Sequence, residues 1–363
     1  MRSPLRQFSS AFTGSWLNVL LLLAPVSWYL ASLHSSPIAV FLTSALSLVP
    51  AAGLIGAATE QLARRSGPAL GGFLNATFGN AAELIIAIMA LRAHHVEVVK
   101  ASITGSIVGN VLLVFGASCL VGGLKHGNQK FSRTASGSAT VMLFLAVVAL
   151  VMPAMVDLVS FGSLHAHPEA IVRLSFWTSA VLLFVYISGL VFTFRQHRDP
   201  LRLTAEHDVT MAVGTAIVLL AVATALTTAG AEVLVGALEP AMKQFGMSEL
   251  FAGVIVIALI GNAAEHYSAV SAAANDQMTL ALEISIGSSA QIALMVAPLL
   301  VLISPFFGTP MSLVFNAFEI TAIVLSVLVT ALVAFDGESN WLEGLQLLAV
   351  YCIMVIAFYL IPA

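Results

Sequence analysis

The chain has 363 residues, of which 59% are hydrophobic and only 9% are charged, and its mean hydropathy is +1.00. A soluble domain has about 25% charged residues, so this composition predicts an integral membrane protein that lies in a lipid bilayer. The net charge of −4 offers no basic surface for nucleic acid, and two cysteines, both in apolar runs, argue against a disulfide framework or a zinc cluster.

Apolar runs of roughly 20 residues, separated by glycine, proline and charged clusters, predict an all-α membrane protein with about eleven transmembrane helices. The first run could be a signal anchor, but further apolar runs follow it at once, so we interpret it as a helix. The connections are short and leave no extramembrane domain. The predicted spans are 16–33, 37–62, 69–92, 98–123, 136–158, 170–194, 208–237, 248–273, 279–304, 311–334 and 341–361.

Basic residues in the short loops predict the orientation of the chain, because cytoplasmic loops are enriched in Lys and Arg. With a cytoplasmic N-terminus, ten of the fourteen Lys and Arg residues fall on the cytoplasmic side. The N-terminus is therefore expected inside and the C-terminus outside. The ten residues are Arg2, Arg6, Arg64, Arg65, Lys125, Lys130, Arg133, Arg195, Arg198 and Arg202.

The sequence Gly-Asn-Ala-Ala-Glu occurs twice within apolar runs, at 79–83 and 182 positions later at 261–265. The next apolar run of each half carries Gly-Ser at the same offset, at 105–106 and 287–288. Because five spans separate the two motifs, they enter the membrane from opposite sides. This predicts two inverted repeats of five helices, the usual plan of secondary transporters, with the substrate site near the midplane. The predicted parts are an extra N-terminal helix, a first repeat, a cytoplasmic linker and a second repeat, at 1–34, 35–195, 196–207 and 208–363.

The repeated glutamates, Glu83 and Glu265, are the candidate ion-binding groups. Each is expected about two thirds of the way along its helix, where an ionised carboxylate costs roughly 2.5–3.5 kcal/mol on insertion scales. No Lys or Arg lies in the core of either helix, so a cation or a proton must compensate the charge. Two carboxylates in one pocket repel each other and titrate as a unit, so we expect a cation and protons to compete for them, as an antiport cycle requires.

Oxygen-bearing side chains accompany both glutamates. Asn80 and Asn262 precede them by three residues, the spacing of one helix face, and Gly79 and Gly261 allow the backbone to approach a neighbour or a ligand closely. Polar stripes continue on the next helices, formed by Ser102, Ser106 and Asn110 in the first half and by Ser285, Ser288 and Gln291 in the second.

This set of side chains suits a hard cation. Calcium takes six to eight oxygen ligands at flexible angles, magnesium demands a stricter octahedron, and the lack of thiolates and clustered imidazoles argues against zinc and copper. His266, beside Glu265, is either a proton relay or a structural histidine. The carboxylates Glu60, Glu232 and Glu239 are either entrance groups or exposed helix ends.

Four segments carry these residues: GGFLNATFGNAAELIIAI at 71–88, ITGSIVGNVLLVFG at 103–116, GNAAEHYSAV at 261–270 and ISIGSSAQIALMVAP at 284–298. They resemble the calcium/proton exchanger (CAX) family of the cation/calcium antiporter superfamily, over nearly the whole chain. The resemblance implies that Glu83 and Glu265 hold Ca²⁺ and exchange it for H⁺. It also implies alternating access, in which the first and sixth helices of the ten-helix core slide past the motif helices, and a bacterial-type protein of the inner membrane.

We therefore expect a secondary-active Ca²⁺/H⁺ antiporter that is not an enzyme, needs no cofactor and is free to form a homo-oligomer. The expected metal ligands are Glu83, Glu265, Asn80, Asn262, Ser106 and Ser288, with proton coupling at Glu83, Glu265 and His266 and a lesser role for Asn110, Gln291, Gly79 and Gly261. The alternatives are an antiporter of Na⁺ or K⁺ coupled to H⁺ or Ca²⁺, and a cation channel. Inverted halves favour a transporter over a pore, and no nucleotide-binding signature is present, so a gradient must supply the energy.

Overall fold

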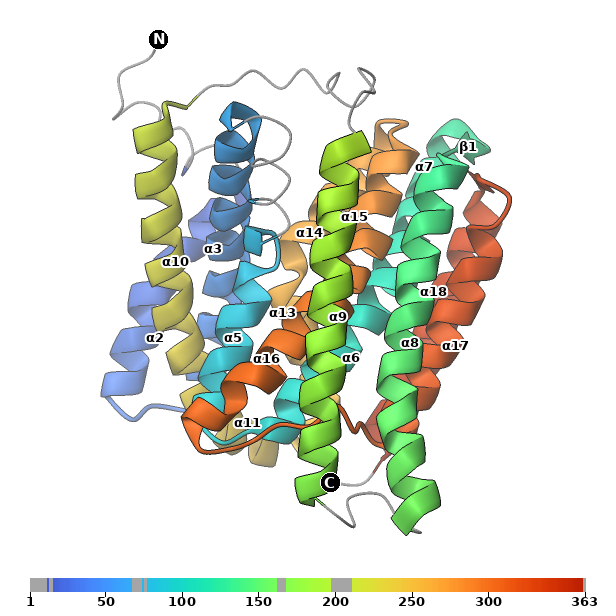
Figure 1. Cartoon of the computed structure of the whole chain (residues 1–363). Helices are drawn as coiled ribbons and strands as arrows, with labels where there is room; N and C mark the ends of the chain where they lie inside the picture. The colour runs from blue at the N-terminus through green and yellow to red at the C-terminus, as the bar shows by residue number, and fades with distance from the viewer. Residues whose placement is uncertain are drawn as a thin grey trace. The chain divides into compact units, whose positions relative to one another are not determined.

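The structure, a computed structural model, describes residues 12, 16–66, 74, 77–161, 168–196 and 211–361. These residues are largely helical, with a single short antiparallel pair of strands among them (Figure 1). The predicted linker 196–207, apart from Gln196, lies outside the described residues, as do most of residues 1–15 and part of the segment 71–76.

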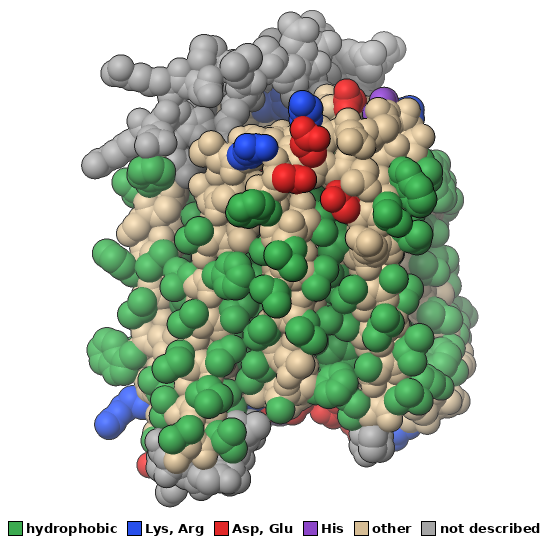
Figure 2. Space-filling view, turned by 90° about the vertical axis from the view of Figure 1, so that its right-hand side faces the viewer, with side chains coloured by type: hydrophobic (Ala, Val, Ile, Leu, Met, Phe, Trp, Pro, Cys, Tyr) green, Lys and Arg blue, Asp and Glu red, His purple; other side chains and the backbone are tan. Residues whose placement is uncertain are grey.

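Seven helices of the described chain are long and apolar enough to cross a membrane, or eight if Leu238–Phe245 and Glu249–Gly261 form one bent span. Hydrophobic side chains cover the middle of the face shown in Figure 2, and charged side chains gather at its two ends. Large apolar side chains are widely exposed, such as Val141 at 69% and Phe184 at 72%. Soluble proteins rarely expose such extended apolar surface, so the chain is an α-helical membrane protein. The count of eleven spans stays a prediction.

The described chain forms two compact units, and the first combines residues before Ala90 with Phe184–Gln244. Within it, α3 packs against α2 and α10. The long helix α3 begins with Pro37, whose fixed φ suits the first helical position, and ends with Arg64 and Arg65, whose charges suit a helix C-terminus. The elements of this unit are η1 (Trp16–Leu22), α2 (Leu23–Ser32), α3 (Pro37–Arg65), most of α5 (Ala81–Arg92), the end of α9 (Pro168–Gln196), α10 (Val213–Gly236) and most of α11 (Leu238–Phe245).

The second unit combines Ala90–Leu183 with Phe245–Ala363. In it, α7 packs against α14 and α18, α15 packs against α14 and α8, and α6 packs against η4 and α17. Its first elements are α6 (Val96–Val108), the π-helical η2 (Gly109–Val114), α7 (Phe115–His126), β1 (Gln129–Lys130) and α8 (Arg133–Phe161). Its later elements are α12 (Glu249–Phe251), the π-helical η4 (Ala252–Ile257), α13 (Ala258–Gly261), α14 (Ala263–Ala274), α15 (Met278–Gln291), the π-helical η5 (Ile292–Val296), α16 (Ala297–Ile303), η6 (Ser304–Phe307), α17 (Ala317–Val333), β2 (Glu338–Ser339) and α18 (Trp341–Leu360).

The helices around the two motifs have matching bounds at the offset of 182 residues. The helix α5 covers Ala81–Arg92 and α14 covers Ala263–Ala274. The following helices, α6 and α15, start at equivalent positions, and each passes directly into a π-helical segment. The turn before each of them contains a residue with positive φ, His94 at 64° and Asp276 at 60°. The local structure therefore repeats in the same register as the sequence.

The two motifs lie at breaks between helices, and the prediction that each glutamate sits two thirds along a continuous helix is wrong. Gly79 and Asn80 form a turn before α5, and Asn262, with φ −92° and ψ 6°, separates α13 from α14. Glu83 and Glu265 each lie in the first turn of the helix that follows. A carboxylate is favoured there by the helix dipole, and broken helices are the elements that commonly bind ions in transporters.

Close backbone packing joins α6 to η4 in the second unit. A Cβ added at Gly105 would overlap the backbone carbonyl of Val254, and one added at Gly253 would overlap the side chain of Ala101. Small residues allow membrane helices to approach this closely. Because Ser106 follows Gly105 directly, this contact fixes the distance between Ser106 and the broken helix that carries Asn262.

Two capping boxes begin the last two helices. Asn316 and Glu319 cap α17, and Asn340 and Glu343 cap α18, each through reciprocal side-chain and backbone hydrogen bonds. Glu319 is only 1% exposed, and its Oε1 also accepts a hydrogen bond of 3.2 Å from the hydroxyl of Thr104 on α6. Glu343 is half-buried. The two capping boxes thus differ in their surroundings, because Glu319 is buried and bonds to a second helix, whereas Glu343 is more exposed.

We expect Glu319→Ala to lower the thermal unfolding midpoint of the detergent-purified protein more than Glu343→Ala does. Both substitutions remove a capping interaction of roughly 0.3–1.5 kcal/mol. Only Glu319→Ala also leaves the buried hydroxyl of Thr104 without its acceptor, at a further cost of about 1–3 kcal/mol. Equal shifts in the two variants would show that the contact between α6 and α17 contributes nothing measurable.

Candidate cation-binding site

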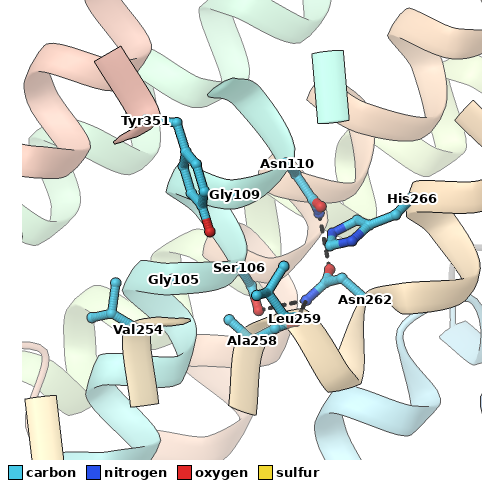
Figure 3. Close-up of a pocket in the computed structure, with 10 residues that line it drawn as sticks. All are labelled: Gly105, Ser106, Gly109, Asn110, Val254, Ala258, Leu259, Asn262, His266 and Tyr351. Atoms are coloured by element: carbon cyan, nitrogen blue, oxygen red, sulfur yellow. Dashed lines mark hydrogen bonds between the residues drawn. The ribbon is translucent and has the colours of Figure 1, made fainter. Parts of the chain in front are cut away.

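A narrow crevice, too tight to admit a water-sized sphere, lies beside the second motif, within the second unit. Its polar lining consists of Ser106 on α6, Asn110 on η2, Asn262 at the helix break, His266 on α14 and Tyr351 on α18 (Figure 3). Figure 3 shows His266 and Tyr351 on opposite sides of the crevice. Four of the five residues belong to the predicted site, Ser106, Asn262 and His266 as ligands or proton-coupling groups and Asn110 with a lesser role, and the crevice brings them together.

The amide of Asn262 has a single orientation. Asn262 is 1% exposed, and its Nδ2 donates to Ser106 Oγ at 2.8 Å and to the backbone carbonyl of Ala258 at 2.9 Å. A backbone carbonyl can only accept, so the NH₂ group must point toward Ala258. Oδ1 of Asn262 consequently faces Asn110.

Asn110 lies at the centre of the polar network. It is fully buried, and its Nδ2 lies 3.0 Å from Asn262 Oδ1, 3.3 Å from Glu265 Oε2 and 3.4 Å from Ser288 Oγ. Its own Oδ1 is buried and has no hydrogen-bond donor among the described residues. A buried acceptor without a hydrogen bond costs about 1–3 kcal/mol, so an interaction of this oxygen with a cation or a hydrogen-bond donor would be favourable.

Glu265 supplies the negative charge of this network. It lies in the first turn of α14 and is half-buried, and its carboxylate accepts from Asn110. One carboxylate, two carboxamides and two hydroxyls thus gather from the α6–η2 helix, the broken helix and α15. Hard cations prefer such oxygen ligands. Among the described residues, no three or more His, Cys, Asp or Glu side chains gather as a metal-binding group.

The first motif is part of the first unit. Asn80 is 1% exposed, its backbone carbonyl accepts from Leu84 N at 3.1 Å, and Glu83 is half-buried in the first turn of α5. Gly79 is exposed, whereas its counterpart Gly261 is buried. Each motif therefore combines a buried asparagine with a half-buried carboxylate at a helix start. The sharing of one site by Glu83 and Glu265 stays a prediction.

The predicted polar stripes are only partly present in the crevice. Ser102 donates to the carbonyl of Val99 at 2.8 Å, and Ser285 donates to that of Ala281 at 2.8 Å. Serine in a membrane helix commonly satisfies its hydroxyl on its own helix in this way. Gln291 is the last residue of α15, directly before η5. Ser106 and Asn110 of the first stripe and Ser288 of the second thus join the polar network around Asn262.

Sequence patterns gave no indication of Tyr351, because it is one of several aromatic residues in the apolar helix α18 and belongs to neither repeated motif. The three helix-end carboxylates belong to the first unit and are not among the residues that line the crevice. Glu60 pairs with Arg64 at 2.6 Å and Glu239 with Lys243 at 2.7 Å, both on exposed helix faces, and Glu232 is exposed. Such exposed ion pairs contribute little to stability.

Comparisons with known proteins identify the family. The family model described as sodium/calcium exchanger protein matches residues 36–195 and 215–360. The Ca²⁺/H⁺ antiporter of Aphanothece halophytica is 40% identical over 362 residues, which cover 94% of this chain and 96% of that protein. The Ca²⁺/H⁺ antiporter ChaA of Bacillus subtilis is 40% identical over 344 residues, which cover 93% of this chain and 96% of that protein.

A solved structure agrees with these relatives. The structure of native YfkE superposes with a TM-score of 0.84 at 37% identity, and the match covers 96% of this chain and 100% of that one. The resemblance to calcium/proton exchangers is thereby confirmed over nearly the whole chain. This chain belongs to the sodium/calcium exchanger protein family, and within it is a close relative of the Ca²⁺/H⁺ antiporters.

Proposed function

We propose that this protein is a secondary-active antiporter that exchanges Ca²⁺ for H⁺ across a membrane. The observation that carries the proposal is the position of Glu265, whose carboxylate joins a buried network of amide and hydroxyl groups at a helix break. Oxygen ligands of this kind suit Ca²⁺. Two relatives that are 40% identical over nearly the full chain are named as Ca²⁺/H⁺ antiporters, and their names support Ca²⁺ and H⁺ as the exchanged ions.

In the proposed cycle, Ca²⁺ and protons compete for Glu83 and Glu265. Asn80, Asn262, Ser106 and Ser288 supply further oxygen ligands to Ca²⁺, with Asn110 beside them. When Ca²⁺ leaves, protons neutralise the carboxylates, because ionised carboxylates without a counter-ion are costly at membrane depth. His266 lines the crevice and directly follows Glu265 in the sequence, and in this cycle it passes protons to and from that carboxylate.

We further propose that the two halves are inverted repeats that alternate the access of this site between the two sides. The matching bounds of α5 and α14 support the repeat, as does the match of the family model to two segments of similar length. With the N-terminus in the cytoplasm, the transporter would export Ca²⁺ from a bacterial cell while protons enter. Inverted repeats around a central site are the common basis of alternating access.

The test is proton movement in vesicles that contain the purified protein and a pH-sensitive dye. After a proton gradient is set, Ca²⁺, Na⁺ and K⁺ are added separately, and we expect proton movement with Ca²⁺. A response only to Na⁺ or K⁺ would replace the proposal with an antiporter of monovalent cations. Ion flux without proton coupling would instead indicate a channel.

A further inference from the structure

The side-chain nitrogen of Asn110 occupies the point toward which three oxygen atoms converge. These atoms are Oδ1 of Asn262, Oε2 of Glu265 and Oγ of Ser288, and the nitrogen of Asn110 lies 3.0 to 3.4 Å from all three. They come from the helix break, from α14 and from α15. A group with positive partial charge thus occupies the place that the proposed cation would need.

The hydrogen-bond network itself determines which end of this amide faces the three oxygens. The acceptor-only carbonyl of Ala258 fixes the NH₂ group of Asn262, and this turns Oδ1 of Asn262 toward Asn110. An amide oxygen and a carboxylate oxygen then both face Asn110 and require a donor from it. The NH₂ group of Asn110 is therefore the end that faces them, and Oδ1 is the end that faces away.

The outward end of the Asn110 amide is unsatisfied. Oδ1 is buried and has no donor among the described residues, although the side chain as a whole is fully enclosed. A half-turn about the Cβ–Cγ bond would exchange the two ends and place Oδ1 among the three oxygens. Four oxygens would then converge there, which is stable only with a cation between them.

We propose that Asn110 is a carboxamide switch that replaces the cation when the site is unloaded and becomes a ligand when it is loaded. Its NH₂ group donates to Asn262, Glu265 and Ser288 in the first state, and its Oδ1 binds a divalent cation together with them in the second. The inference rests on the proposed function, because it takes Ca²⁺ as the ion of this site. The switch lowers the cost of the unloaded state and so speeds the release of the cation.

The two functions of the amide can be separated by substitution. Asn110→Asp keeps the ligand oxygen and adds a charge but cannot donate, so it lacks the group that replaces the cation. We expect this variant to bind Ca²⁺ about 10-fold more tightly, because ligand charge tunes calcium affinity, and to exchange it about 10-fold more slowly. Asn110→Leu keeps the branched shape and the number of side-chain heavy atoms but neither donates nor ligates, so it should bind Ca²⁺ more weakly than the wild type.

The experiment measures ⁴⁵Ca²⁺ binding to the full-length purified variants and Ca²⁺-driven proton flux in vesicles. The control is Asn275→Asp, which makes the same chemical change at an exposed amide whose NH₂ group donates to the carbonyl of Ser271 at the end of its own helix. This variant should match the wild type in both measurements. Tighter binding with slower flux in Asn110→Asp supports the switch. Unchanged or weaker binding in that variant, while the wild type exchanges Ca²⁺, overturns the switch and leaves the proposed function standing. Failure of the wild type to exchange Ca²⁺ overturns both.

Discussion

Glu265→Gln is expected to reduce Ca²⁺-driven proton flux at least about 100-fold, while folded protein remains in the membrane. Partners that only orient a metal ligand already contribute about 10–100-fold to affinity or activity, so removal of the charged ligand itself should exceed that range. Glutamine keeps the size of the side chain and one carbonyl oxygen, and Asn110 can still donate to it. A loss of flux in this variant is therefore due to the missing charge and the missing proton-binding group. Ca²⁺-driven proton flux in vesicles measures this loss.

The same result is expected for Glu83→Gln, because the first motif repeats the arrangement of a half-buried carboxylate in the first turn of a helix. Glu249→Gln provides a matched control, since Glu249 is an exposed glutamate in the first turn of α12 in the second unit. Its flux should equal that of the wild type. Coupled transport retained in Glu265→Gln or in Glu83→Gln would remove that residue from the site.

Gly105→Ala is expected to prevent the accumulation of stable protein or to lower its unfolding midpoint strongly. The new Cβ would overlap the carbonyl of Val254, and this obstacle is backbone that cannot rotate away. The whole contact between α6 and η4 must then open, and overpacking of this kind costs about 1–3 kcal/mol or more. With a total stability of only about 5–15 kcal/mol, such a loss is large.

Gly287→Ala is the control for this prediction, because Gly287 is equivalent to Gly105 at the offset of 182 residues. A Cβ at Gly287 would meet no atom within 4 Å. Alanine also favours a helix over glycine by about 0.5–1 kcal/mol, so this variant should be as stable as the wild type or more so. Thermal unfolding in detergent and the yield of purified protein measure both variants. Equal behaviour of the two would contradict the close packing of α6 on η4.

The sequence indicated the helical class and the register of the repeat, because composition and identical motifs are directly visible in it. The equal bounds of α5 and α14 follow that register. The breaks at Asn80 and Asn262 were not predicted, since the residues on either side of the second motif are apolar and continue a helical pattern. Gly followed by Asn was the available signal, because both residues are common where helices end.

The composition of the crevice was harder to predict than its location. Ser106 and Ser288 lie in the network, whereas Ser102 and Ser285 belong to the same polar stripes and bond to their own helices. Helical spacing predicts on which face of a helix a residue lies, but it does not predict which side chain of another helix that residue contacts. The central position of Asn110 depends on three neighbouring segments, and the equivalent position in the second half is the apolar Ile292, so the repeat gave no signal for it.

The most direct test of the account is the number of protons released when Ca²⁺ binds to the purified protein in weakly buffered solution. If Ca²⁺ and protons compete for Glu83 and Glu265, the wild type releases protons on binding, and Glu265→Gln releases fewer and binds Ca²⁺ weakly. Binding of Ca²⁺ with no proton release, or with the same release in the wild type and in Glu265→Gln, would contradict it.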